Sequence, residues 1–403
     1  MDIKRIRKDF PIFERKINGK PIIYFDSACT TLKPKQVVEA MNEYYYSYPA
    51  CAGRAVHKLS TGLTTKIDEV REKVANFISS NDSNEIIFTK NTTEGVNLLA
   101  RSMGLRKGDL VITTDREHNS NFVPWLYLKE KIGIEHIIIP TQDEKFMYEE
   151  YEKALSGNKK KLKLVSMAHK SNLDGYIIPD DIIKIAHENE ALVLLDCAQS
   201  IAHKKIDLKR LEPDFIVFSG HKMLGPTGIG VLYGRYELLE KMEPFILGGD
   251  TFEKTTYSSY SLLPPPKKFE AGNQNYAGII GLGAAIDYLR KLGDIEKYVN
   301  ELTNLIVKGM SEIDGLEFVG FKGYGGIINF NAKNIDSHNL AIILDEEENI
   351  MVRSGMHCVH SWYFSRKIPG SVRATIYIYN TKEEARIFLD TIEKIIKKLR
   401  STK

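Results

Sequence analysis

The residues that could do chemistry begin with a lysine near the middle of the chain. Lys222 follows the apolar run 215–218 and Ser219, and it precedes a glycine-rich stretch at 225–230. A short apolar run that gives way to glycine predicts a strand end with Lys222 at its edge. An amine desolvated there has a lowered pKa and can act as a nucleophile. For one isolated lysine, a solvated side chain on a loop is the simpler interpretation.

An acid at the end of an earlier strand changes that interpretation. Residues 192–195 are apolar and end at Asp196. A carboxylate on one strand end and a lysine on a later one suit pyridoxal phosphate (PLP) chemistry. The carboxylate holds the pyridine nitrogen protonated, and the lysine binds the aldehyde covalently. The sequence therefore predicts a PLP site built on Asp196 and Lys222.

The elements that must position these groups alternate between strands and helices from about residue 86 to residue 233. This alternation predicts a mostly parallel sheet covered on both faces, with ligands bound beyond the strand ends. Polar residues recur at those predicted ends: Asn172, Asp196, Gln199, Ser219, His221 and Lys222. Thr92 and Thr93 open a predicted helix, either as N-cap residues or as part of an anion site.

The pattern of predicted elements changes at about residue 293. After it, we predict strands with alternating, half-exposed residues and a last helix at 382–399. We expect a large α/β domain at 15–292. A smaller α+β domain at 293–403 should have residues 1–14 packed on it. Within the smaller domain, Cys358 lies among Arg353, Ser354, His357 and His360. Polar neighbours favour a reactive thiol over a structural cysteine, and the ligand spacing is too sparse to predict a metal site.

Composition limits the function classes. The net charge is only +3, from 56 basic and 53 acidic residues, which argues against a nucleic-acid or anionic-membrane binder. No apolar run is long enough to span a bilayer, and the N-terminus lacks the apolar stretch of a secretory signal. The four cysteines are scattered without a CxxC pair, which is typical of a reducing cytoplasm. We therefore expect a cytoplasmic protein.

Taken in order, the motifs resemble the class V branch of the fold-type-I PLP enzymes, and most closely the group II (Suf-type) cysteine desulfurases. The resemblance implies a large domain with a mainly parallel seven-stranded sheet, plus a smaller α+β domain. It also implies a homodimer that converts L-cysteine to L-alanine. The sulfur would pass to an acceptor or scaffold protein for iron–sulfur cluster assembly or thiolation. The matching stretches are 24–31, 54–60, 91–100, 117–125, 169–175, 196–199, 218–230, 269–283, 353–358 and 373–381.

The resemblance also implies roles for single residues. Lys222 would bind the cofactor aldehyde, Asp196 the pyridine nitrogen and Gln199 the ring hydroxyl, while His118 would stack on the ring. Cys358 would accept the sulfur as a persulfide. The phosphate would be held by Thr92, Thr93, Ser219, His221 and Asn273. The substrate would be bound by Asn172, Arg373, Ala28 and Arg54, with Arg54 and the Asn273 loop supplied across the dimer interface.

Several positions depart from the family pattern. Cys29 replaces a common alanine, Cys197 a glycine, Asn273 a threonine, and Asn119 the second histidine of a Glu-His-His motif. These departures leave two alternatives open. One is a selenocysteine lyase or cysteine sulfinate desulfinase. The other is a sulfur or metal (iron–sulfur) carrier with four thiols near one pocket: Cys29, Cys51, Cys197 and Cys358. Buried cysteines acting as small hydrophobes are the commoner arrangement.

Overall fold

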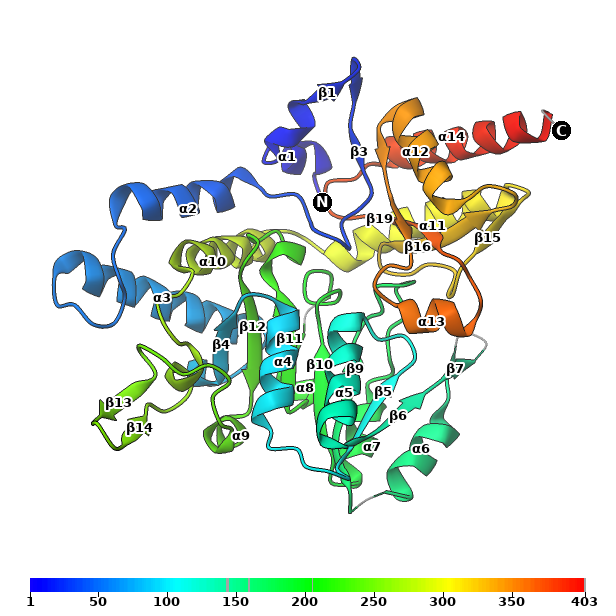
Figure 1. Ribbon diagram of the computed structural model, residues 1–403. Helices are drawn as coiled ribbons and strands as arrows, with labels where there is room; N and C mark the ends of the chain where they lie inside the picture. Colours follow the sequence, from blue (N-terminus) through cyan, green and yellow to red (C-terminus); the bar gives the residue numbers. More distant parts are fainter. Residues whose placement is uncertain (143–144, 159, 205, 402–403) are drawn as a thin grey trace.

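In the part of the chain that the structure describes, residues 1–142, 145–158, 160–204 and 206–401, a seven-stranded sheet forms the centre of this computed structural model (Figure 1). The strand order is β4-β12-β11-β10-β9-β5-β6, and β12 runs antiparallel to both of its neighbours. The strands are β4 (Ile86–Thr89), β5 (Leu110–Thr114), β6 (Glu135–Ile139), β9 (Leu162–Ala168), β10 (Leu192–Asp196), β11 (Phe215–Ser219) and β12 (Gly230–Gly234). The predicted mainly parallel sheet is confirmed.

Helices cover both faces of this sheet because its strands are apolar on both sides. One face packs α4 (Thr92–Ser102) and α5 (Asn119–Ile132) over alternate strand residues such as Val217. The other packs α3 (Lys58–Phe77), α7 (Asp181–Glu188) and α10 (Tyr276–Arg290) over the residues between them, such as Ile216. The remaining helices of this part are α2 (Lys35–Ser47), α6 (Tyr148–Ser156), α8 (Leu208–Leu211) and α9 (Tyr236–Lys241).

A second, antiparallel sheet has the described strand order β15-β16-β19-β18. The helices α11 (Ile295–Glu312), α12 (Ser337–Glu348) and α14 (Lys382–Ser401) pack against it around a separate core that contains Phe330 and Phe388. The other elements here are β15 (Leu316–Phe318), β16 (Ile327–Ala332), β17 (Ile350–Met351), β18 (Arg353–Gly355), α13 (His360–Ser365) and β19 (Ser371–Thr375).

The N-terminal segment connects the two parts. β3 (Ile23–Tyr24) pairs in parallel with β17, and Ile23 and Phe25 lie in the core of the second sheet. Further upstream, Phe10 packs edge-on against Tyr288 of α10 and Tyr379, which follows β19. Residues 1–14 therefore contact both parts. The predicted domain boundary at 292/293 falls between α10 and α11, and the domain assignment stays a prediction.

Two local expectations were wrong. The N-cap of α4 is Asn91, whose side chain accepts a hydrogen bond from the Glu94 amide, rather than Thr92 or Thr93. The prolines and polar residues at 250–268 predict a long irregular connection, but this stretch contains a hairpin, β13 (Phe252–Thr255) and β14 (Tyr260–Leu262). The hairpin was missed because its strands are short and largely exposed, so they lack the alternation that marks a half-buried strand.

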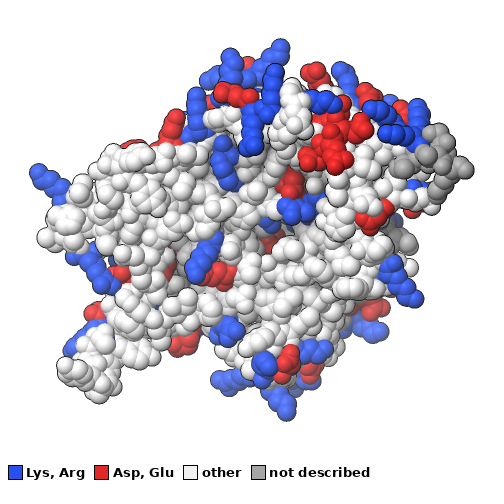
Figure 2. Space-filling view, turned by 45° about the horizontal axis from the view of Figure 1, so that its top comes forward, with Lys and Arg blue, Asp and Glu red and all other residues white. Residues whose placement is uncertain are grey.

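The surface is unevenly charged. Figure 2 shows Lys, Arg, Asp and Glu side chains crowded at the top of the view, whereas the left side is mostly uncharged. Large apolar side chains are exposed on α2, on the loop before α3 and on the β13–β14 hairpin, among them Tyr46, Val56, Tyr257 and Tyr260. Across the described residues, we find no helix that has both the length and the apolar character needed to cross a membrane.

Candidate active site

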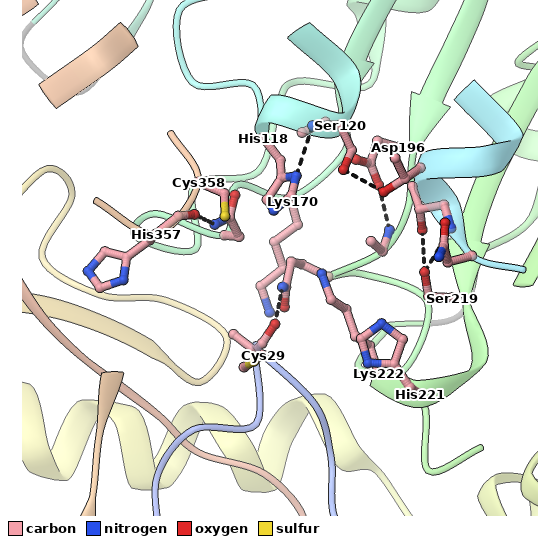
Figure 3. A pocket seen from close by; sticks show the side chains of 18 of the residues that line it. Cys29, His118, Ser120, Lys170, Asp196, Ser219, His221, Lys222, His357 and Cys358 are labelled. Atoms are coloured by element: carbon pink, nitrogen blue, oxygen red, sulfur yellow. Dashed lines mark hydrogen bonds between the residues drawn. The ribbon is translucent and has the colours of Figure 1, made fainter. Parts of the chain in front are cut away.

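A pocket of about 260 Å³ opens beyond the carboxyl ends of β9, β10 and β11, where loops of the second sheet meet them (Figure 3). Polar ends of parallel strands are the usual place for a ligand in such a sheet. The pocket brings together the predicted residues Ala28, Thr92, Thr93, His118, Asn172, Asp196, Gln199, Ser219, His221, Lys222, Cys358 and Arg373. It also contains Cys29, Lys170, Arg353 and His357.

Lys222 reaches the pocket because the chain turns tightly after β11. Residues Gly220–Lys222 form one 3₁₀ turn, and the His221 carbonyl accepts hydrogen bonds from the Thr31 amide (3.0 Å) and the Lys33 ammonium (2.8 Å). Gly230, the first residue of β12, lets that strand approach the start of α4, since a Cβ there would lie 2.6 Å from the Asn91 Cα. The Gly220 amide of the turn donates to the Ile229 carbonyl, just before β12, at 2.9 Å. The turn is thus fixed from both sides, and the direction of Lys222 with it.

The N-terminus of α4 forms one wall of the pocket. The Ser219 hydroxyl accepts a hydrogen bond from the Thr92 amide at 2.8 Å and lies 2.7 Å from the Thr92 hydroxyl. On the same wall, the hydroxyls of Thr93 and Ser120 lie 2.7 Å apart. Hydroxyls around a helix N-terminus make a site suited to an anion, because free N–H groups and the helix dipole both favour negative charge.

Burial shifts the pKa values of Asp196 and Lys222 in opposite directions. Burial raises the pKa of the Asp196 carboxyl, while the nearby Lys222 ammonium lowers it. Burial lowers the pKa of Lys222, and Asp196 partly offsets that shift. One Asp196 oxygen accepts the Ala198 amide at 2.9 Å, and among the described residues the other has no hydrogen bond. The pair therefore offers an acid with an open acceptor and an amine biased toward its nucleophilic form.

Two histidines at the pocket are held neutral. Burial, with the charges of Lys222 and Arg373, lowers the pKa of His118 to about 3. Its Nδ1 accepts the Ser120 amide at 3.0 Å, which fixes the ring at the start of α5. Burial and the Lys222 charge lower the pKa of His221 to about 4. At neutral pH both rings can therefore stack or hydrogen-bond without adding charge.

Arg373 on β19 supplies a buried guanidinium with unused donors. The side chain is buried, and its Nη1 donates to the Asn172 carbonyl at 2.8 Å. Within the described residues its Nε has no hydrogen-bond partner, and its Nη2 lies 3.9 Å from the nearest Asp26 oxygen. Free donors on a fixed guanidinium fit the planar oxygens of a carboxylate.

Cys358 faces the same pocket from the opposite part of the molecule. Figure 3 shows Cys358 and His357 entering from the loop after β18. The side chain of Cys358 is exposed at the mouth of the pocket. Its carbonyl accepts the Asn119 amide at 2.7 Å, and the His357 carbonyl accepts the Asn172 side chain at 2.7 Å. The loop that carries the thiol is therefore attached to both walls.

Comparisons with known proteins agree with this geometry. The family model of class-V aminotransferases matches residues 23–388. This chain belongs to that family. A probable cysteine desulfurase of Halalkalibacterium halodurans is 40% identical, with 98% of both chains covered. The apo structure of a cysteine desulfurase from Thermococcus onnurineus has a TM-score of 0.91 at 40% identity, covering 98% of both chains. The cysteine desulfurase CsdA of Escherichia coli has a TM-score of 0.89 at 28% identity, covering 98% of this chain and 99% of that one.

Within the class-V family, the protein is therefore placed among the cysteine desulfurases, and the cofactor of the family is PLP. The residues present fit that cofactor. The open Asp196 oxygen suits a protonated ring nitrogen, and the desolvated Lys222 suits an aldehyde. The start of α4, with Thr92 and Ser219, suits a phosphate. When bound, PLP supplies an electron sink for a carbanion at the substrate Cα.

Two pocket residues of this class-V protein escaped the sequence analysis. Lys170 is 3% exposed and donates from Nζ to the Gly325 carbonyl at 2.5 Å, and burial lowers its pKa to about 7. Glu117 lies just behind the pocket wall and accepts bonds from Thr114, Asn121 and the Ala168 amide. Burial raises the pKa of Glu117 to about 8. Both follow predicted strands, so their position at a strand end was an available signal.

Two predicted residues do not line the pocket within one chain. Arg54 is exposed and forms an ion pair with Asp250. The Asn273 side-chain amide lies 3.4 Å from the Cys51 sulfur, in the segment before α10. The resemblance assigns both to the partner subunit's site, so their roles stay predictions.

The four cysteines do not share a site, contrary to the arrangement expected for a carrier. Cys29 and Cys358 line the pocket, Cys197 is buried in the core, and Cys51 is exposed before α3. Among the described residues, no group of three or more His, Cys, Asp or Glu side chains could hold a metal ion. The four-thiol alternative therefore lacks a site within one chain.

Proposed function

We propose that this protein acts on L-cysteine as a PLP-dependent desulfurase, that it releases L-alanine, and that it carries the sulfur on Cys358 as a persulfide. One observation supports this most strongly. A single pocket joins the Asp196–Lys222 pair to a fixed guanidinium, Arg373, and to a thiol, Cys358. The similarity to cysteine desulfurases over nearly the full chain supports the same activity.

The residues divide the work in the proposed site. With the cofactor bound, Asp196 would keep the ring nitrogen protonated, Gln199 would bind the ring hydroxyl, and neutral His118 would stack on the ring. Thr92, Thr93, Ser219 and His221 hold the phosphate. Lys222, with its pKa lowered by burial, accepts the proton from the substrate Cα and later returns a proton to the carbon skeleton. The turn after β11 fixes the backbone of Lys222, and its side chain already lines the pocket.

Arg373 and Cys358 act on the two ends of the substrate. The free Nε and Nη2 of Arg373 bind the carboxylate and orient the Cα–H bond, with Asn172 beside them. The Cys358 thiolate then forms an S–S bond to the substrate sulfur as the Cβ–S bond breaks. The thiolate is the reactive form of a cysteine, and Cys358 lines the same pocket as the guanidinium groups of Arg353 and Arg373.

A single-turnover experiment tests the proposal. Enzyme loaded with PLP is mixed with one equivalent of L-cysteine, and alanine and protein-bound sulfane sulfur are measured together. Wild type should yield equal amounts of both. Cys358→Ser should yield no bound sulfane sulfur, whereas the matched control Cys51→Ser, which changes an exposed thiol outside the pocket, should behave as wild type. Persulfide formation that survives in Cys358→Ser would contradict the assignment of the acceptor thiol.

Selenocysteine offers a further comparison with the same proteins. A selenocysteine lyase or a sulfinate desulfinase needs less from Cys358, so its rate should hardly fall in Cys358→Ser. For a cysteine desulfurase we expect the variant to lose turnover of L-cysteine far more than turnover of selenocysteine. Equal retention of both rates would instead favour the lyase.

We further propose a homodimer and an acceptor protein for the sulfur. The exposed apolar side chains of α2, the loop before α3 and the β13–β14 hairpin lie on the mostly uncharged side seen in Figure 2. A surface of that kind is typical of a protein interface. It would bring Arg54 and Asn273 toward the partner's pocket, and it leaves the mouth at Cys358 open to an acceptor.

Mixing two inactive variants tests the shared site. If Arg54 acts across the interface, a hybrid of Lys222→Ala and Arg54→Ala subunits contains one intact site. Random reassortment should then restore about a quarter of wild-type activity, since half of the dimers are hybrids with one of two sites intact. No recovery after subunit exchange, verified by mass spectrometry of intact dimers, would exclude the shared site.

A further inference from the structure

The loop that carries Cys358 has an unusual backbone. His357 and Cys358 have φ angles of +51° and +58°, so two consecutive non-glycine residues occupy the left-handed region. Each residue there costs free energy, and such a conformation persists only when its neighbours impose it. The loop therefore depends on contacts from outside itself.

Those contacts come from two asparagines on opposite walls and from Ser371, whose hydroxyl lies 3.0 Å from His357 Nε2. On one side, Asn172 donates from its side chain to the His357 carbonyl at 2.7 Å, and this bond is buried. On the other side, Asn119 donates twice. Its amide reaches the Cys358 carbonyl at 2.7 Å, and its side-chain nitrogen lies 2.9 Å from His360 Nδ1. The second contact of Asn119 is exposed, so it can break and re-form without moving buried groups.

The position of Asn119 connects the thiol to the cofactor side of the pocket. Asn119 is the first residue of α5 and follows His118, the N-cap of that helix. His360 is the first residue of α13, which begins two positions after Cys358. The Asn119–His360 pair thus joins the starts of two helices, one beside the ring-stacking His118 and the other beside the thiol.

We propose that Asn119 is a positioning residue that, through His360, keeps the strained Cys358 loop closed with its thiol directed into the pocket. This inference rests on the proposed function for its purpose, because a thiol that must meet the substrate sulfur gains from being held near it. It requires that His360 accept the hydrogen bond at Nδ1 from the Asn119 amide group. Losing this exposed contact leaves the buried bond from Asn172 to the His357 carbonyl in place, but it removes one of the bonds that oppose opening, so the open fraction of the loop rises.

Hydrogen–deuterium exchange tests the closed loop without any turnover. The PLP-loaded protein is diluted into D2O, and mass spectrometry follows the peptide that contains the Val359 amide, which donates to the Met356 carbonyl at 2.8 Å across the Cys358 loop. A peptide from α6 in the same sample is the internal reference. A net hydrogen bond changes a population by about fivefold. We expect Asn119→Ala and His360→Ala each to raise the exchange rate of the loop peptide relative to the α6 peptide by about that factor. The double variant should show no further increase, because both changes remove the same contact.

Two controls keep the result interpretable. Asn119→Leu keeps the approximate size of the side chain, but it can neither donate nor accept a hydrogen bond at His360, so it should match Asn119→Ala. Asn84→Ala removes an exposed asparagine at the opposite end of β4 and should match wild type. An unchanged exchange rate of the loop peptide relative to the α6 peptide in the single variants, or multiplied effects in the double variant, would overturn the proposal.

A second measurement separates this inference from the proposed activity. In a single turnover, the variants should form protein-bound sulfane sulfur about fivefold more slowly, while the absorption of the bound cofactor stays unchanged. If hydrogen exchange of the loop changes as expected and neither wild type nor any variant yields alanine, the positioning role stands and the desulfurase proposal fails. If alanine forms at the wild-type rate in all variants and hydrogen exchange of the loop is unchanged, the positioning role fails alone.

Discussion

Arg373 offers the sharpest test of how the pocket recognises its substrate. Replacing it by lysine keeps the positive charge and removes the fork of donors. Nη1 of the guanidinium already donates a hydrogen bond to the Asn172 carbonyl, and its Nε has no hydrogen-bond partner among the described residues. A lysine ammonium could not bond Asn172 and both oxygens of a carboxylate in the same geometry. Arg373→Lys should therefore weaken the substrate carboxylate contact specifically.

The size of the effect follows from the number of bonds lost. A hydrogen bond to a charged group contributes about 1.5–3 kcal/mol. Losing one of the two bonds to the carboxylate should lower kcat/KM for L-cysteine by about 10- to 150-fold. Because the side chain is buried, solvent screening should not reduce this loss much.

Cysteamine, which lacks the carboxylate, isolates this contact. Steady-state release of sulfide in the presence of dithiothreitol gives kcat/KM for both substrates in both proteins. The ratio of cysteine to cysteamine should fall by the factor above in Arg373→Lys, while the value for cysteamine changes little. Arg366→Lys, which alters an arginine paired with Asp115 away from the pocket, should leave the ratio unchanged. An equal fall for both substrates in Arg373→Lys would refute the role assigned to Arg373.

Three further outcomes are expected. Asp196→Asn should still bind PLP but lower kcat/KM for L-cysteine by about 100-fold, because a neutral amide cannot hold the ring nitrogen protonated. Absorption of the cofactor measures PLP binding and release of alanine measures activity; full activity would contradict the role of Asp196. Burial lowers the pKa of His169 to about 4 from its ordinary 6.5, so between these pH values the unfolded chain binds a proton that the folded chain does not, and stability falls as the pH falls. At pH 5 the free energy of unfolding should be about 2 kcal/mol lower than at pH 7 because of this residue. In urea unfolding at the two pH values, His169→Phe should therefore lose about 2 kcal/mol less stability than wild type does. Gly175→Ala should destabilise the protein by more than about 2 kcal/mol, since the φ of Gly175 is +81° and an added Cβ would overlap the Tyr324 carbonyl. Gly62→Ala in α3 should instead stabilise it by about 0.5–1 kcal/mol, because no described atom lies within 4 Å of the added Cβ. Denaturant midpoints that shift in the same direction for both variants would contradict this.

The sheet and much of the pocket could be predicted because their signals are local. The runs ending at Asp196 and Ser219 are short, apolar and followed by polar or glycine residues, so both strand ends and their chemistry were visible. Parallel neighbours then place those ends side by side, as the register of β10 with β9 and β11 shows. The roles of single residues came from the family resemblance and remain to be tested.

Long-range features could not be predicted from such patterns. Nothing near Asn119 in the sequence indicates His360, which is 241 positions away, and the two meet only because the loop after β18 folds over α5. From the sequence alone, Lys170 would be taken for a solvated lysine, because its buried contact with Gly325 is visible only in the structure. The N-cap of α4 was misplaced by one or two residues because Asn91, Thr92 and Thr93 can all cap a helix, and their neighbours decide among them.

The pairing of β3 with β17 has a consequence for how the chain is made. The Phe25 amide bonds to the Met351 carbonyl at 2.9 Å, and the Phe25 carbonyl accepts the Thr375 amide at 2.7 Å. At about 5–20 residues per second, tens of seconds of translation separate these partners on the ribosome. Lys222 and Asp196 emerge well before Cys358 and Arg373, so a nascent chain can assemble the amine side of its pocket first. A chain that stops short of residue 350 would lack the thiol, and it would leave its own N-terminal strand exposed to the quality-control machinery.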